Sequence, residues 1–178
     1  MTVILTEQDA AAVLDAALGE IGLFHVLKEV SGVLMQPQAA QIAPDTSPRR
    51  LRIDRLLLPT QKLTGLGWAS GAVGIEIKSS DQALEGPVLS QALDYRRCLW
   101  MIPSSGIRIW LDWLFIFPLE AQHGPLASLM AHNRIGTCAA NTWTRLHFKT
   151  GEQNVLKVHH DGQVDIGQMQ AGRKAGSR

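Results

Sequence analysis

A continuous apolar run at residues 111–118, LDWLFIFP, sets the first limit on the fold. The run has the length of a β-strand, and a strand without alternating polar residues is typically covered on both faces. Trp110 and Trp113 are expected to pack in the core beside it. Apolar residues at helical spacing over residues 6–28 and 84–99 supply two covering helices. The sequence therefore predicts an α/β fold in which helices flank a central sheet.

Strand and turn signals alternate along the rest of the chain. Thr6 and Asp9 form a candidate capping box at the start of the first helix. An Asp161-Gly162 turn between alternating runs predicts a β-hairpin near the C-terminus, and the Pro- and Gln-rich segment 38–48 predicts a loop. The expected order is helix 6–28, strands 31–37, 49–58 and 72–79, helix 84–99, strand 111–118, helix 126–132 and a C-terminal β-rich region.

Charge and cysteine content exclude several classes of protein. The 178 residues include 17 Lys and Arg against 16 Asp and Glu, so nucleic acid would have to be bound by local basic clusters. Cys98 and Cys138 are too few for a disulfide scaffold or a Cys-only zinc site, and we expect both to be buried. The N-terminus does not resemble a secretory signal, and charged residues interrupt the most apolar stretch. We therefore expect a cytoplasmic protein without a membrane segment.

Two acidic residues and a lysine on neighbouring predicted strands are the strongest candidates for chemistry. Glu76 and Lys78 are two apart, so their side chains share one face of the strand. If strands 49–58 and 72–79 pair, Asp54 lies beside Glu76. Two carboxylates form a hard oxygen site suited to Mg²⁺ or Mn²⁺, and a nearby ammonium can stabilise charge on a phosphate. A Glu-x-Lys pair is also common on exposed strands, where it has no catalytic role.

The second predicted helix adds two polar residues on one face. Gln91 and Tyr95 are one helical turn apart, and their helix begins a few residues after the Glu-x-Lys strand. Gln91 can order Lys78 or bind a phosphate, and the Tyr95 hydroxyl can do the same. The alternative is an ordinary amphipathic helix with a marginal Gln and a half-buried Tyr.

In this order, Asp54, Glu76-x-Lys78 and Gln91-x-x-x-Tyr95 resemble the PD-(D/E)xK nuclease superfamily. The Gln-x-x-x-Tyr element is similar to the variant in RecB-like exonuclease domains and their phage or mobile-element relatives. The resemblance implies a restriction-endonuclease-like αβββαβ core with a central mixed sheet and a C-terminal β-hairpin extension. We accordingly divide the chain into a nuclease-like core (1–120), a β-rich extension of the same domain (121–170) and a disordered basic tail (171–178).

The resemblance also implies a role for each matching residue. Asp54, Glu76 and the backbone carbonyl of Ile77 would bind Mg²⁺ or Mn²⁺, and Lys78 would orient or deprotonate the attacking water. Gln91 and Tyr95 would support the site. Many members carry a further acid on the first helix, for which Glu20 is the candidate here; an exposed helix charge is the equal alternative.

Metal-dependent hydrolysis of DNA is the function that this resemblance implies. The DNA backbone would be bound by local arginines, namely Arg50, Arg52, Arg55 and Arg96, and a homo-oligomer is a further expectation. The chain departs from the family in having Arg52 where a Gly is usual and no Pro directly before Asp54. Two alternatives therefore stay open: a non-catalytic nucleic-acid-binding or assembly module with this fold, and an unrelated α/β domain.

Overall fold

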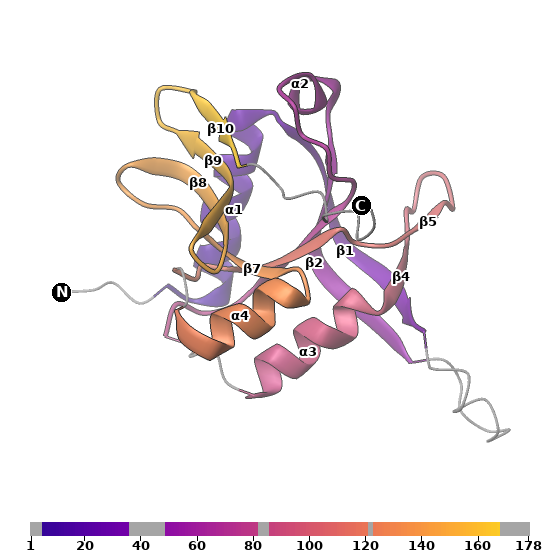
Figure 1. The fold of residues 1–178 in the computed structure, drawn as a ribbon. Coiled ribbons are helices and arrows are strands. Elements are labelled where there is room, and N and C mark those ends of the chain that lie inside the picture. The colour runs from indigo at the N-terminus through magenta and orange to yellow at the C-terminus, as the bar shows by residue number, and fades with distance from the viewer. Residues whose placement is uncertain (1–4, 36–48, 82–85, 121–122, 168–178) are drawn as a thin grey trace, which may run out of the picture.

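The computed structural model describes residues 5–35, 49–81, 86–120 and 123–167. The predicted loop 38–48 and tail 171–178 lie outside these residues. Within them the chain forms four helices and one ten-stranded sheet (Figure 1). The helices are α1 (Glu7–Ile21), α2 (Gln61–Gly65), α3 (Gly86–Arg96) and α4 (Gly124–His132). The strands are β1 (Phe24–Leu34), β2 (Arg50–Pro59), β3 (Val73–Ile77), β4 (Cys98–Met101), β5 (Arg108–Ile109), β6 (Trp113–Phe117), β7 (Ile135–Ala139), β8 (Thr144–Thr150), β9 (Gln153–His159) and β10 (Val164–Ile166).

The sheet is mixed, with strand order β10-β9-β8-β7-β6-β3-β2-β1-β4-β5. β1, β2 and β3 are antiparallel neighbours, whereas β6 runs parallel to β3 and β7 parallel to β6. The remaining strand pairs are antiparallel. This confirms the predicted α/β class and mixed sheet. The predicted C-terminal strands extend the same sheet beyond β7.

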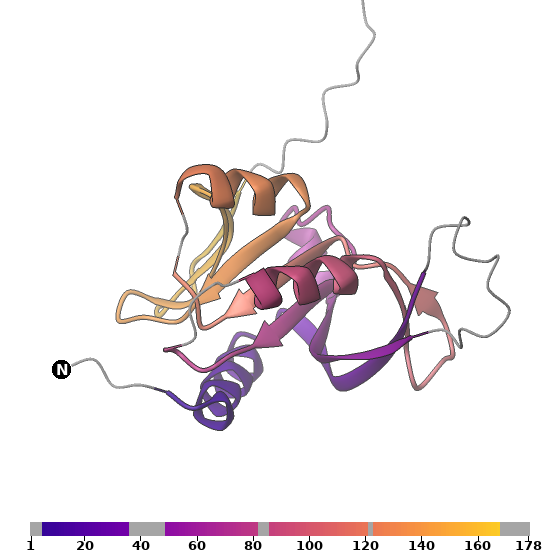
Figure 2. The ribbon, with the colours of Figure 1, turned by 90° about the horizontal axis from the view of Figure 1, so that it is seen from below.

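Helices cover both faces of the sheet, with α1 on one side and α3 and α4 on the other (Figure 2). Leu14 and Leu18 of α1 pack with Phe115 and Phe148 in one core. The other core joins α3 and α4 to the opposite face, with Leu114 of β6 at its centre. Almost all of β6 is therefore buried, as predicted for a strand covered on both sides.

The first helix is shorter than the sequence predicted. The capping box is present, because the Thr6 side chain accepts from the Asp9 amide and the Asp9 side chain accepts from the Thr6 amide. The helix ends at Gly22, whose φ of 59° is left-handed and whose N–H bonds to Leu18 O. Such glycines commonly terminate helices. The expectation of helix to residue 28 was wrong, since β1 begins at Phe24.

Other local predictions have mixed outcomes. Both cysteines are buried, as expected. Trp110 was expected in the core, but it is 51% exposed because it stands before β6 and outside the layers. Trp113 is half-buried and stacks with Phe115 at a centroid distance of 6.0 Å. Among the described helices, none is both long and apolar enough to cross a membrane.

Candidate functional site

The site begins where strands β2 and β3 separate. At this end the last paired residues are Arg55 of β2 and Ile75 of β3. Beyond them, the Asp54 side chain bonds to the main chain of Ile77. The Ile77 amide donates to Asp54 Oδ2 at 2.7 Å, so the carboxylate takes the place of a main-chain acceptor. Continuing the antiparallel register places Asp54 level with Glu76. The local geometry thus brings the two acids to one place.

Glu76 is a buried carboxyl with one oxygen unused. Its side chain is only 7% exposed, and Oε1 accepts from Lys78 Nζ at 2.7 Å. Oε2 is buried and has no hydrogen-bond partner within the described part of the chain. Burial and the nearby Asp54 charge raise the pKa of Glu76 to about 7, against the lowering effect of the Lys78 hydrogen bond. The site therefore holds more negative charge than its single lysine balances.

A chain of hydrogen bonds connects this pair to helix α3. Lys78 Nζ donates to Gln91 Oε1 at 3.3 Å, and Gln91 Nε2 donates to the Tyr95 hydroxyl at 2.7 Å. Tyr95 in turn donates to the Arg52 carbonyl of β2 at 2.8 Å. Burial, followed by the Glu76 charge, raises the pKa of Tyr95, which keeps its hydroxyl a donor. The network fixes the ammonium beside Glu76.

The donor set fits a hard divalent cation with few protein ligands. Among the described residues there is no group of three or more His, Cys, Asp or Glu side chains arranged for a metal. Mg²⁺ is, however, commonly held by one or two carboxylates, with water and phosphate oxygens completing its shell. The unpartnered Glu76 Oε2, the neighbouring Asp54 carboxylate and the raised pKa of Glu76 are what such a cation would satisfy. Asp54, Glu76 and the Ile77 carbonyl are the residues that would hold it.

An open pocket of about 220 Å³ lies next to Asp54. It is lined by Asp54, Arg55 and Ile77, by Glu29 of β1, and by the first two turns of α1, including Glu7. The start of α1 is tied to the end of β3, because Leu5 N donates to Ser80 Oγ at 2.7 Å and Ser80 N donates to Leu5 O at 3.0 Å. Glu7 lines this pocket, and Asp15 of the same helix binds Arg55, another lining residue, at 2.7 Å, so α1 brings two acids to this region.

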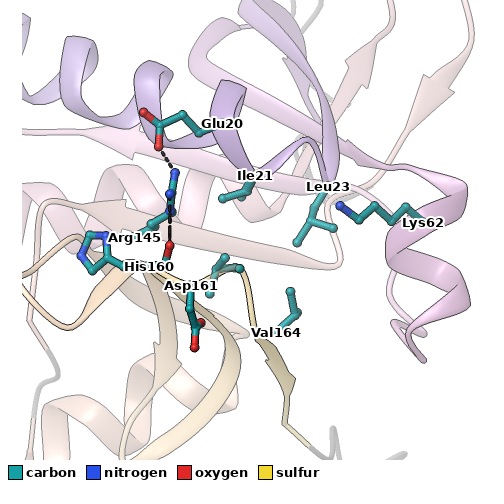
Figure 3. Close-up of a pocket in the computed structure, with 10 residues that line it drawn as sticks. Glu20, Ile21, Leu23, Lys62, Arg145, His160, Asp161 and Val164 are labelled. Atoms are coloured by element: carbon teal, nitrogen blue, oxygen red, sulfur yellow. Dashed lines mark hydrogen bonds and ion pairs between the residues drawn. The ribbon is translucent and has the colours of Figure 1, made fainter.

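Glu20 lies elsewhere. Thirteen residues separate it from Glu7, which is about 20 Å along a helix. Its carboxylate pairs with Arg145 of β8, and both line a second pocket that also includes His160 and Asp161 (Figure 3). The structure thus brings together Asp54, Glu76, Lys78, Gln91 and Tyr95, but it does not bring Glu20 to them.

The four arginines predicted to bind DNA have different environments. Arg50 is exposed, and Arg52 is exposed but paired with Glu29 at 2.7 Å. Arg55 is buried and binds Asp15 through Nε and Nη2, at 2.7 and 3.0 Å, so its guanidinium is engaged inside the protein. Arg96 is half-buried and donates to two main-chain carbonyls.

Two residues near the site were not found from the sequence. Glu7 has a sequence signal, since it is an acid in the first turn of a capped helix, but only the topology shows which end of α1 meets β3. Glu29 has a φ of 53° within β1, and no pattern in the sequence indicates this. Trp68, which follows α2, is buried against Phe24 with a centroid distance of 6.1 Å, so its ring is not free to stack on a base.

Comparison with known proteins identifies no relative: no family model, no curated protein and no solved structure matches this chain. The geometry therefore carries the functional argument alone. It consists of two carboxylates, a fixed ammonium and a supporting Gln–Tyr pair at one end of the parallel strands.

Proposed function

We propose that this protein is a metal-dependent nuclease of the PD-(D/E)xK type, acting on DNA with Mg²⁺ or Mn²⁺. The observation that carries the proposal is the convergence of Asp54, Glu76 and Lys78, with one buried Glu76 oxygen that no described residue bonds. Structural ion pairs do not normally leave a buried carboxylate oxygen unsatisfied.

The arrangement of elements around these residues supports the same proposal. Helix α1, the antiparallel strands β1, β2 and β3, helix α3 and the parallel strand β6 follow the αβββαβ order expected of a restriction-endonuclease-like core. β4 and β5 are added outside β1, and β7 to β10 extend the other side. The Gln91–Tyr95 pair on α3 is bonded to Lys78 through Gln91, which is consistent with the supporting role that the Gln-x-x-x-Tyr resemblance implies.

The chain's own residues would position the phosphodiester. A bound Mg²⁺ or Mn²⁺ would lower the pKa of water at the site and would neutralise negative charge on the phosphate. Lys78 Nζ, held by Glu76 and Gln91, would donate to a phosphate oxygen or orient the attacking water. Tyr95 would keep Gln91 in place rather than contact the substrate, because its hydroxyl already bonds to β2.

The test is cleavage of linear, circular and single-stranded DNA, and of RNA, with Mg²⁺, Mn²⁺ or EDTA. We expect the wild type to cleave only with metal, and Asp54→Asn and Lys78→Met to lower the rate by about 100-fold or more. Glu152→Gln, an exposed acid on the β8–β9 turn, is the matched control. Circular dichroism and thermal unfolding would show that each variant is folded.

The outcomes separate the proposal from its alternative. Cleavage that persists equally in both site variants would contradict it. Metal-independent binding of DNA without cleavage, unaffected by either substitution, would instead favour a non-catalytic module that keeps the fold. A cytoplasmic location and a homo-oligomeric state stay predictions alongside the proposed activity.

A further inference from the structure

A basic pocket lies between the C-terminal ends of α3 and α4. It has a volume of about 260 Å³ and is lined by Leu93, Arg96, Arg97, His132, Asn133 and Arg134. No carboxylate is among these lining residues. This group is called the basic pocket below.

One arginine of the basic pocket is fixed by the fold. Arg96 Nε donates to the Asn133 carbonyl at 3.1 Å, and Nη1 donates to the Leu111 carbonyl. Its guanidinium thus joins the end of α3 to the end of α4 and to the segment before β6. Nη2 donates to no acceptor within the described residues, so the planar group keeps a donor for a ligand.

The exposed arginines of the basic pocket are not paired with carboxylates. Arg49, Arg52, Arg55 and Arg145 each pair with a carboxylate, whereas the exposed Arg50 and Arg108 also form no ion pair with a described residue. Arg97 and Arg134 are exposed and form no ion pair with any described residue. The nearest acid on α3, Asp94, is bound to Arg49 at 3.1 Å and is therefore engaged.

Electrostatics within the pocket agree with this arrangement. Burial lowers the pKa of Arg96, and the charge of Arg134 lowers it further, while Asp112 acts in the opposite direction. The Asp112 carboxylate already accepts from the Gly71 amide. The mutual repulsion of the Arg96 and Arg134 guanidinium groups, which Asp112 offsets only in part, favours the binding of an anion.

The backbone at Arg134 gives an independent indication. Its φ is 54°, directly after the α4 cap residue Asn133. Glycine or asparagine is usual at this left-handed position, because other side chains are strained there. Basic residues at helix ends complement the helix dipole, which accounts for Arg96 because it bonds to a terminal carbonyl. It does not account for Arg134, whose backbone is strained and whose side chain has no hydrogen-bond or ion-pair partner in the described part of the chain.

We propose that the basic pocket binds a backbone phosphate of nucleic acid, as a second contact remote from the Asp54–Glu76–Lys78 site. The guanidinium groups offer the planar donors that suit phosphate oxygens. This second site depends on the proposed nuclease function only in that its ligand is taken to be nucleic acid.

The geometry places the two sites at opposite ends of β6. Arg96 bonds to Leu111 before the strand, and the Lys78 amide bonds to the Phe117 carbonyl at its end. Six residues of extended chain span about 20 Å, which equals the axial rise of about six base pairs in a B-form duplex. Helix α3 contributes to both sites, through Gln91 in the first and Arg96 in the basic pocket. A single short duplex can therefore contact both.

The test measures binding without cleavage. Fluorescence anisotropy of a labelled duplex of about 20 base pairs in EDTA would give affinity over a range of KCl concentrations, from about 50 to about 200 mM. For the double variant Arg97→Glu/Arg134→Glu we expect about tenfold weaker binding or more, and a salt dependence whose slope falls by about one to two. Arg108→Glu, which reverses an exposed arginine on β5, is the matched control and should bind like the wild type.

A second variant separates binding from folding. Arg134→Gly relieves the left-handed backbone, so its melting temperature should be no lower than that of the wild type while its affinity falls. Unchanged affinity and salt slope in the double variant would overturn the proposal. A site for small anions only would overturn it too: inorganic phosphate would raise the melting temperature of the wild type but not of the double variant, while duplex binding stayed equal.

The result is independent of the proposed activity. If the wild type cleaves DNA and the double variant binds DNA as tightly as the wild type, the phosphate site is disproved and the proposed nuclease activity stands. Weakened binding in the double variant, without cleavage by the wild type under any condition, would keep the phosphate site and remove the nuclease.

Discussion

Charged side chains are buried in the central strands and exposed at the end of α1. The side chains of Glu76 and Lys78 on and after β3 are 7% and 15% exposed, and that of Arg55 on β2 is 7% exposed. Glu20 and Arg145 also form an ion pair, but their side chains are 61% and 30% exposed. The same types of residue therefore occupy two different electrostatic environments.

The difference shows where the protein can do chemistry. An exposed pair is solvated and screened, so it changes neither partner greatly. Glu76 is a buried carboxyl whose pKa is raised and whose Oε2 has no hydrogen-bond partner among the described residues. The candidate site is distinguished from the surrounding surface by the burial of its charged side chains, and not by the presence of an acidic residue on α1.

The largest expected change in stability comes from Arg55→Ala. The variant removes a bidentate pair with Asp15 and leaves the Asp54 carbonyl without its donor at 2.7 Å. We expect a loss of about 3 kcal/mol in the free energy of unfolding, measured by urea denaturation. Arg145→Ala, the exposed counterpart, should lose less than about 1 kcal/mol. Equal losses would contradict the distinction between the two regions.

The stability of Glu76→Gln relative to the wild type should depend on pH. In the metal-free fold the pKa of Glu76 is about 7, above its ordinary 4.5. When folding raises the pKa of a carboxyl, the protein keeps its full stability below the pKa of the unfolded state. It loses stability as the pH rises from the pKa of the unfolded state to that of the folded state. Removing the charge should thus stabilise the metal-free protein above about pH 7, by about 1 to 3 kcal/mol, and leave it unchanged near about pH 4.

Urea denaturation at several pH values would check this expectation. Glu20→Gln is the control, since its carboxyl is exposed. A stability difference between Glu76→Gln and the wild type that stays constant across the pH range would contradict the burial argument.

A smaller effect is expected from Tyr95→Phe. The substitution removes the hydroxyl that joins Gln91 to the Arg52 carbonyl, which should lower stability by about 1 kcal/mol. If the network acts as one unit, a double-mutant cycle with Gln91→Ala should give a coupling energy of about 0.5 kcal/mol or more. Additive losses would show that the two side chains act independently.

The smallest effect is expected from Glu20→Gln. It should lower stability by less than about 0.5 kcal/mol, because an exposed pair contributes little, and it should leave the cleavage rate unchanged. Glu7→Gln, at the end of α1 that faces Asp54, should lower the rate instead. A larger loss of cleavage rate in Glu20→Gln than in Glu7→Gln would contradict this distinction.

Much of this arrangement follows from local patterns in the sequence. The apolar run around Leu114 predicted a covered central strand, and Glu76, Lys78, Gln91 and Tyr95 were selected by the two-residue and four-residue spacings of strand and helix. These spacings decide which face a side chain occupies. They hold because each pair lies within a single element.

Relations between elements were harder to predict. Glu20 was chosen because helical spacing does not say which end of α1 meets β3, and that end is set by the Leu5–Ser80 contacts. Arg55 carries the same charge as its neighbours, but its strand position directs it toward Asp15 on α1. The helix to residue 28 was expected because the apolar residues after Gly22 fit a helical period by chance, while the backbone at Gly22 turns.

The most direct test of the proposed site is to locate Mn²⁺ in crystals soaked at concentrations that support cleavage, using its anomalous scattering. We expect one peak within about 2.5 Å of both the Asp54 and the Glu76 carboxylates, absent in Asp54→Asn. A fully soaked crystal with no peak between these carboxylates, or with manganese only at other acids such as Glu20, would contradict it.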